Sequence, residues 1–361
     1  MNRPGFSRAR RTLPVDCPPA PRLNQACLPQ ARRLIRAVVG ALLFLLAQPA
    51  HQAPALISGA GRAGSRPTII DALGDTLSAG PCPQRIVSLS PSVTEILFVL
   101  GVDSSRIVGV TRFCDYPPAA RRRPVMGGIV DPSPEVILAQ RPDLVLAVRG
   151  NPRPLLRQLG RLGLPVFAFD DRTGLTGVGE MMEAVTAVSC PDDPARADSV
   201  VAWFRAAVAA YETWAAAIPP AERPTVYYAD PEFPTWTAGA GSHIDDLVRM
   251  AGGVNLAGAL PGWPQMSLER IILDQPRFLL LALSAGQDPA RAYEEMMAKP
   301  GWSGLAALRE KRICWIPAAR LQRPGPRLVE VLGELAACLH PDRARPMVAA
   351  PPGTDRIVGT R

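Results

Sequence analysis

The fold class follows from the pattern in Asp131-Pro-Ser-Pro-Glu-Val-Ile-Leu-Ala-Gln-Arg-Pro-Asp-Leu-Val-Leu-Ala147. Ser133 predicts the start of a short helix, because its hydroxyl can accept a hydrogen bond from an amide of the first turn. Pro142 leads into the apolar run 143–148, which is typical of a buried strand. Helices that alternate with such strands predict an α/β fold with a mainly parallel sheet.

The same pattern occurs again in Gln265-Met-Ser-Leu-Glu-Arg-Ile-Ile-Leu-Asp-Gln-Pro-Arg-Phe-Leu-Leu-Leu281. The serine, the glutamate and the proline each recur 134 residues later, as Ser133 and Ser267, Glu135 and Glu269, and Pro142 and Pro276. A repeat of this kind predicts two equivalent α/β lobes. The ligand cleft is then expected between the lobes, at the carboxyl ends of their strands.

The first lobe is expected over residues 67–190. It begins with a β-hairpin signal at 68–77, where Gly74-Asp75 turns the chain between alternating apolar positions. Four apolar runs follow, separated by amphipathic stretches, and they lie at 85–90, 107–111, 143–148 and 165–170. This alternation predicts a βαβ series.

A linking helix is expected at 194–218 and a second lobe at 223–340. The linking segment has 25 residues with no proline or glycine after Pro194, which would make a helix about 37 Å long. The second lobe repeats the alternation of strands and helices, with apolar runs at 225–230, 278–283 and 313–317. The tail 343–361 is rich in Pro, Ala and Gly, and we expect it to be disordered.

The positive charge is concentrated in residues 1–55, which hold eight arginines and one acidic residue. An apolar stretch, 37–47, follows the arginines and precedes small residues, which is the order of a secretory signal. We therefore expect a signal peptide at 1–55, cleavage between about Ala47 and Leu56, and a periplasmic protein. The alternatives are a short membrane-tethering helix or a start codon placed too early. The remaining chain is nearly neutral, so nucleic-acid binding is not expected.

Cysteine and histidine are too sparse to predict a metal site or a resident cofactor. Five cysteines follow the expected signal: Cys82, Cys114, Cys190, Cys314 and Cys338. An odd number leaves at least one unpaired or paired between chains, and the pairing stays open. His243 and His340 are the histidines beyond residue 55, and neither lies in a metal motif. No catalytic motif is present, so we expect no catalytic residue and no enzyme.

Several motifs together carry a resemblance to a known family. They are Gln84-Arg-Ile-Val-Ser-Leu-Ser-Pro-Ser-Val-Thr-Glu95, Cys114-Asp-Tyr-Pro-Pro118, Arg141-Pro-Asp-Leu144, Gly252-Gly-Val-Asn255, Trp263-Pro-Gln-Met-Ser267 and Pro326-Arg327. From about residue 67 to 340 the chain resembles the periplasmic binding proteins for cobalamin. Their class has two α/β lobes joined by one long helix, and it also carries haem and ferric siderophores to ABC importers. The resemblance implies a non-enzymatic receptor for a cobalamin-like corrinoid, with haem or a ferric siderophore as the alternative.

The resemblance also implies which residues contact the ligand. It places Tyr116 of the first lobe, with Trp236 and Trp263 of the second, at the mouth of the cleft. A corrinoid is a broad, mostly apolar disc edged with amides, and flat aromatic side chains suit such walls. Arg149 and Arg323 align near the cleft, where they could bond amides or phosphate. In the other interpretation, Tyr116 is a surface turn residue and Trp263 fills the core under a loop.

The expected site departs from the pattern of cobalamin binders at one loop, and haem is an alternative ligand. The loop Gly127-Gly-Ile-Val130 has Ile129 where cobalamin binders can present another aromatic residue. The first-lobe wall is then thinner, or the ligand differs. Haem would require an axial ligand such as Tyr116 or Tyr211, provided that the cleft exposes it.

The repeated glutamates, Glu135 and Glu269, have two interpretations. Each lies two residues after a capping serine, where a carboxylate stabilises the helix by about 0.3 to 1 kcal/mol. In the family that the chain resembles, a glutamate at this place on each lobe docks into arginine pockets of the permease subunits. Two equivalent charges on two lobes would set the orientation of docking. We therefore expect a monomer with two kinds of partner, a corrinoid ligand and ABC importer permease subunits.

Overall fold

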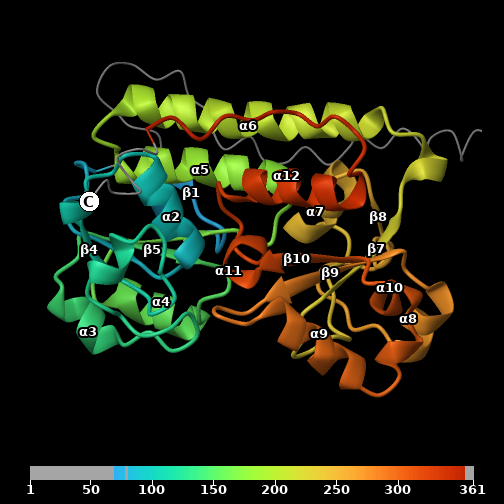
Figure 1. Ribbon diagram of the computed structural model, residues 1–361. Coiled ribbons are helices and arrows are strands. Elements are labelled where there is room, and N and C mark those ends of the chain that lie inside the picture. The colour runs from blue at the N-terminus through green and yellow to red at the C-terminus, as the bar shows by residue number, and fades with distance from the viewer. Residues whose placement is uncertain (1–68, 78–79, 354–361) are drawn as a thin grey trace, which may run out of the picture. The chain divides into compact units, whose positions relative to one another are not determined.

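The computed structural model describes residues 69–77 and 80–353, which form two four-stranded parallel sheets and a separate hairpin (Figure 1). The predicted fold class is confirmed, since each sheet is covered by helices and one long helix joins the two regions. The predicted signal peptide at 1–55 lies outside the described residues.

The first sheet has the strand order β4-β3-β5-β6, with all neighbouring strands parallel. Its strands are β3 (Ile86–Ser88), β4 (Ile107–Val110), β5 (Leu144–Val148) and β6 (Val166–Phe169). The lobe's helices are α2 (Pro91–Val99), α3 (Pro134–Ala139), α4 (Arg153–Arg161) and α5 (Leu175–Ser189), with short 3-10 turns η2 (Ser104–Arg106) and η3 (Ala120–Arg122). Alternate residues of β5 pack on opposite faces, toward α2 and α5 on one side and toward α3 and α4 on the other. Burial on both faces explains why this strand is apolar throughout.

The predicted hairpin is present as β1 (Ile69–Ile70) and β2 (Thr76–Leu77), which pair antiparallel. Gly74 takes a φ of +88° in the turn, a conformation that glycine adopts without strain. The Ala72 amide donates to the Ala168 carbonyl at 2.8 Å, which attaches the hairpin to β6.

The second sheet has the order β10-β9-β7-β8 and is also parallel. Its strands are β7 (Thr225–Ala229), β8 (Val254–Asn255), β9 (Phe278–Leu283) and β10 (Ile313–Pro317). The lobe's helices are α7 (His243–Met250), α8 (Leu268–Asp274), α9 (Pro289–Ala298), α10 (Ala306–Arg309), α11 (Ala318–Leu321) and α12 (Leu328–Leu339), with 3-10 turns η4 (Pro220–Glu222) and η5 (Trp302–Gly304).

The repeat in the sequence is also a repeat in the backbone. Ser133 accepts a hydrogen bond from the Val136 amide at the start of α3, and Ser267 accepts one from the Arg270 amide at the start of α8. A residue with positive φ follows each helix, Arg141 at +48° and Gln275 at +43°, again 134 residues apart. The strands that follow, β5 and β9, begin at the same spacing.

The long helix α6 (Pro194–Ala216) begins at Asp193, whose carboxylate accepts from the Arg196 amide at 3.0 Å. It lies against α5 of the first lobe and against α7 and α12 of the second (Figure 1). Buried side chains of these helices belong to one continuous apolar cluster that includes Phe204 and Leu335. The two lobes are therefore joined by shared packing as well as by the covalent link.

Residues 343–353 lie along α6, as the terminal red segment of Figure 1 shows. The indole N–H of Trp203 donates to the Ala349 carbonyl at 2.8 Å, and that of Trp214 donates to the Ala344 carbonyl at 2.7 Å. Residues 343–353 belong to the tail for which the sequence predicts disorder, and side chains of α6 satisfy carbonyl groups of this segment. Composition alone could not reveal these donors. Residues 354–361 lie outside the described part.

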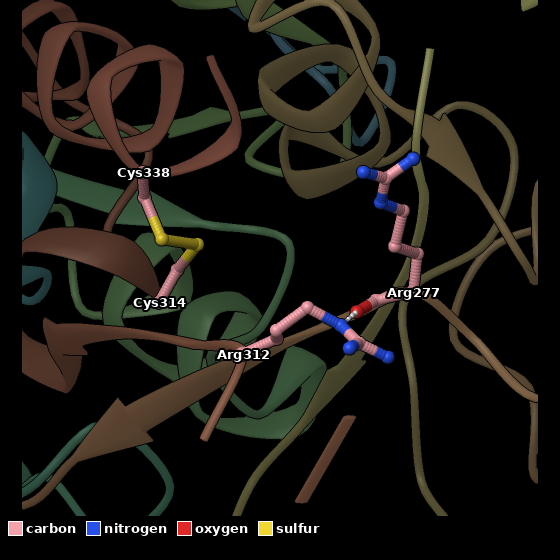
Figure 2. Close-up of a disulfide and its surroundings, with 4 residues drawn as sticks. All are labelled: Arg277, Arg312, Cys314 and Cys338. Carbon is pink, nitrogen blue, oxygen red and sulfur yellow. Dashed lines mark hydrogen bonds between the residues drawn. A yellow bond between two sulfur atoms is a disulfide. The ribbon is translucent and has the colours of Figure 1, made fainter. Parts of the chain in front are cut away.

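The structure supplies a cysteine pairing that the sequence left open. Cys314 of β10 and Cys338 of α12 form a disulfide, which ties a strand to the helix that covers it (Figure 2). In the same view, Arg312 Nε donates to the Arg277 carbonyl at 2.8 Å, joining the residues that precede β10 and β9. Cys114 is a buried thiol in hydrogen-bond contact with Thr94.

Candidate functional site

The loops that follow the strands of the first sheet reach the second lobe at two places. After β6, the Leu175 amide at the start of α5 donates to Asp246 Oδ2 of α7 at 2.8 Å. A Cβ on Gly174 would lie 2.1 Å from that oxygen, so the close approach requires glycine. After β4, Asp115 meets Arg323, which follows α11 of the second lobe. Both contacts arise at carboxyl ends of strands, where parallel sheets place ligand sites.

The second contact belongs to a group of four side chains, Glu95, Asp115, Arg323 and Arg327, which we call the inter-lobe ion cluster. Arg327 Nε and Nη2 donate to the two oxygens of Glu95 at 2.8 and 2.5 Å. Arg323 Nη1 donates to Asp115 at 2.5 Å and lies 3.4 Å from Glu95 Oε1. The cluster joins two carboxylates of the first lobe to two guanidiniums of the second, so its formal charges balance.

Glu95 is the most buried member of the cluster, with a relative exposure of 3%. Burial raises the pKa of this carboxyl group, while hydrogen bonds and charge from Arg327 and Arg323 act in the opposite direction. A two-point guanidinium–carboxylate contact is the geometry that best compensates a buried charge.

Tyr116 lies at the inter-lobe ion cluster. The guanidinium carbon of Arg327 stands 4.1 Å from the centre of the Tyr116 ring, a cation–π contact between the lobes. The ring is half-buried, and burial raises the pKa of its hydroxyl group. A ligand that contacts Tyr116 would therefore share the aromatic ring with Arg327.

The structure places Trp236 and Trp263 on two loops of the second lobe that pair with each other. Trp236 forms an antiparallel bridge with Gln265, and the Thr237 amide donates to the Pro264 carbonyl at 3.0 Å. Both indoles are exposed, Trp236 by 51% and Trp263 by 44%. We call these two side chains the tryptophan platform.

The tryptophan platform is connected to Arg323 through two buried residues, Tyr228 and His243, and the exposed Gln322, which sequence reasoning missed. The Trp263 ring packs edge-on against Tyr228, whose hydroxyl accepts a hydrogen bond from Gln322 Nε2 at 2.9 Å. His243 Nε2 bonds the Leu321 carbonyl at 3.0 Å, and complete burial lowers the pKa of His243 to about 4. Gln322 is the neighbour of Arg323, so these contacts fix the loop that carries the arginine.

Arg149 lies where β5 ends and pairs with Asp170 at the end of β6, with 2.8 Å between Nη1 and Oδ2. Both side chains are about one-third exposed. The neighbouring Asp171 has a buried oxygen, Oδ1, for which the described residues offer no hydrogen-bond partner, and burial raises its pKa. This edge of the first sheet is polar and can bond the amide groups of a ligand.

Two further exposed aromatic residues lie close in the sequence to residues of the predicted site. Phe113 precedes Cys114 in the first lobe, and Phe233 precedes the tryptophan platform in the second. The only sequence signal was an aromatic residue in a loop rich in polar groups, which does not separate a ligand contact from a surface residue.

Glu135 and Glu269 are both exposed at the starts of α3 and α8. Ser133 Oγ donates to Glu135 Oε2 at 3.0 Å, so this glutamate takes part in capping as well. The apolar side chains of Val130 and Leu273 are also exposed close by in the sequence, one on each lobe. The two glutamates are thus accessible to a partner.

Within residues 69–77 and 80–353, no group of three or more His, Cys, Asp or Glu side chains is placed to hold a metal ion. No helix in this part of the chain combines the length and apolar character needed to cross a membrane.

Comparison with known proteins gives the family context. A model of the periplasmic binding protein family matches residues 86–319. A cobalamin-binding protein of Halobacterium salinarum is 30% identical over 321 residues, which cover 85% of this chain and 85% of the relative. A vitamin B12-binding protein of Yersinia pseudotuberculosis is 30% identical over 206 residues, which cover 56% of this chain and 71% of the relative.

Solved structures show the same two-lobed architecture with different ligands. A periplasmic haem-binding protein from Pseudomonas aeruginosa superposes with a TM-score of 0.66 at 25% identity, over 74% of this chain and 96% of that one. The periplasmic vitamin B12-binding protein of Vibrio cholerae gives a TM-score of 0.61 at 26% identity, over 71% of this chain and 98% of that one. The choice of ligand must therefore come from the site.

Proposed function

Because this chain belongs to the periplasmic binding protein family, we propose that it captures a cobalamin-like corrinoid between its lobes and delivers it to an ABC importer. The observation that carries the proposal is the tryptophan platform. Two exposed indoles on paired loops offer a large apolar surface, and the polar edge formed by Arg149 and Asp170 lies at the carboxyl ends of the first sheet.

The chemistry of a corrinoid suits this arrangement. Its disc would lie against apolar indole surface, and its amide edge would bond side chains such as Arg149 and Gln322. Asp230, which follows β7 and accepts a hydrogen bond from Gln322 Nε2 at 3.1 Å, could bond the same edge. The cobalt already has ring nitrogens and can carry its own lower base, so the protein needs no metal ligand. The ligand names of two curated relatives support the same choice.

Haem is the second candidate, because a haem-binding protein is among the similar solved structures. The two tyrosines considered as axial ligands are both engaged in other contacts. Tyr211 is 3% exposed and donates its hydroxyl to the Pro346 carbonyl, while Tyr116 lies against Arg327. Burial raises the pKa of both phenols, which disfavours the tyrosinate form that binds iron. These contacts favour a corrinoid over haem.

A competition experiment tests the proposal. The purified mature protein is incubated with equal amounts of cyanocobalamin and haemin and then freed of unbound ligand. The proposal expects the corrinoid spectrum in the protein fraction and no Soret band. A Soret band without corrinoid absorbance would replace this function with haem binding.

Delivery and location complete the proposed function. Glu135 and Glu269 are proposed to dock the two lobes onto permease subunits, each glutamate meeting its own subunit. Residues 1–55 are proposed to direct export to the periplasm. Mass measurement of the periplasmic protein should find a new amino terminus between about Ala47 and Leu56, and a protein that retains Arg32 to Arg36 would contradict export with cleavage.

A further inference from the structure

The segment 343–353 spans the contact between the lobes. At one end the indole of Trp214, near the carboxyl end of α6, holds Ala344. At the other end, a Cβ on Gly353 would lie 2.9 Å from Nε of Arg196, in the first turn of α6. The segment therefore follows about 27 Å of the helix, at 1.5 Å per residue. It lies beyond the residues that match the family model.

Residues 343–353 are bonded to α6 at several points along the helix. Three side chains on one stripe of α6, Trp203, Tyr211 and Trp214, donate to backbone carbonyls of the segment. Between these bonds, Val348 packs against the main apolar cluster. Arg343 forms an ion pair with Glu222, so the segment is also anchored where it leaves α12. We call residues 343–353 the strap.

The strap forms one wall of an open pocket next to the inter-lobe ion cluster. This cavity has a volume of about 640 Å³ and is lined by both lobes, by α6 and by the strap, including Tyr116, Trp203, Glu330 and Pro346. A much smaller space of about 20 Å³ adjoins it and is lined by Glu95, Tyr116, Arg327, Glu330 and Pro351. Pro351 of the strap is thus one wall of the small space beside the ion pair between Glu95 and Arg327.

We propose that the strap keeps water away from the inter-lobe ion cluster and thereby holds the two lobes at a fixed angle. The attraction between Glu95 and Arg327 depends on the local dielectric, and it weakens severalfold when water replaces protein around the pair. With the strap in place the ion cluster and α6 both oppose relative motion of the lobes. Without the strap, hydration weakens the cluster, and the lobes are then joined by α6, by the shared apolar packing and by the Leu175–Asp246 hydrogen bond.

The test measures the distance between the lobes without any ligand, so its outcome does not depend on the proposed function. Fluorophores are attached through p-azidophenylalanine at Leu162 of the first lobe and Leu273 of the second, both exposed, which leaves the native cysteines unlabelled. Trp203→Phe with Trp214→Phe removes two hydrogen bonds to the strap and retains most of the aromatic volume. Removal of residues 343–361 is the stronger variant. Trp315→Phe in β10 is the matched control.

The proposal expects a narrow distance distribution in the native protein and in the control. It expects a broader distribution in the double tryptophan variant and in the shortened chain. Glu95→Gln should broaden the distribution too, and adding the strap variant to Glu95→Gln should change little more, since both act through one cluster. Two results would overturn the proposal. One is an unchanged distance distribution in the folded strap variants. The other is that the strap substitutions broaden the distribution by the same amount in the native protein and in the Glu95→Gln protein.

Discussion

Glu95 in α2 and Arg327 at the start of α12 join the two lobes by a two-point ion pair, with donor–acceptor distances of 2.8 and 2.5 Å. The residues are 232 positions apart in the chain. Glu95 belongs to a motif that suggested family membership, and Arg327 belongs to another, yet nothing in either motif indicated that the two side chains meet. Their contact shows that the lobe interface is held by charge as well as by apolar packing.

Loss of this ion pair should destabilise the protein strongly. Glu95→Ala leaves Arg323 and Arg327 without their buried partner, which is expected to reduce the free energy of unfolding by about 3 to 5 kcal/mol. The control is Glu334→Ala, because Glu334 pairs with Arg320 at the surface and its loss should cost at most about 1 kcal/mol. Urea unfolding followed by circular dichroism measures both. Equal, small losses in the two variants would contradict a structural role for the inter-lobe pair.

The tryptophan platform should contribute much of the ligand affinity. Trp263→Ala and Trp236→Ala are each expected to weaken corrinoid binding by about 1 to 3 kcal/mol, through loss of apolar contact. Leu162→Ala removes an exposed apolar side chain of the first lobe and should leave the dissociation constant unchanged. Unchanged affinity in both tryptophan variants would place the ligand elsewhere.

His243 should make stability depend on pH. Its pKa is lowered from 6.5 to about 4 in the folded protein, so the unfolded chain binds more protons between these values. The free energy of unfolding should therefore fall as pH decreases from 6.5 to 4, by about 3 kcal/mol for this group. Glutamine does not titrate and can still donate to the Leu321 carbonyl, so His243→Gln should lose less stability between pH 7 and pH 4.5. Parallel loss in both proteins would contradict a neutral, buried His243.

The two exposed glutamates should affect transport and leave binding intact. Glu135→Arg and Glu269→Arg are expected to reduce uptake of the ligand, and the double variant should reduce it further, because each lobe is proposed to meet its own permease subunit. Ligand affinity measured on the same purified variants should match that of the native protein. Normal uptake by the double variant would leave the glutamates with a helix-capping role alone.

Local signals in the sequence were sufficient for the fold. Ser133 and Ser267 predicted two helix starts, and the helix formers after Pro194 predicted α6, because capping and propensity act over a few residues. The position of Tyr116 against Arg327 and the pairing of Cys314 with Cys338 could not be predicted in this way. Each depends on a partner supplied by a distant segment. The strap was missed for the same reason, since its stabilising donors lie on α6.

Calorimetric titration of the mature protein with cyanocobalamin, haemin and a ferric siderophore would identify the ligand that this protein binds. We expect saturable binding of cyanocobalamin at one site per chain and much weaker binding of the other two ligands. Tight binding of haemin or the siderophore, with no heat from cyanocobalamin, would contradict it.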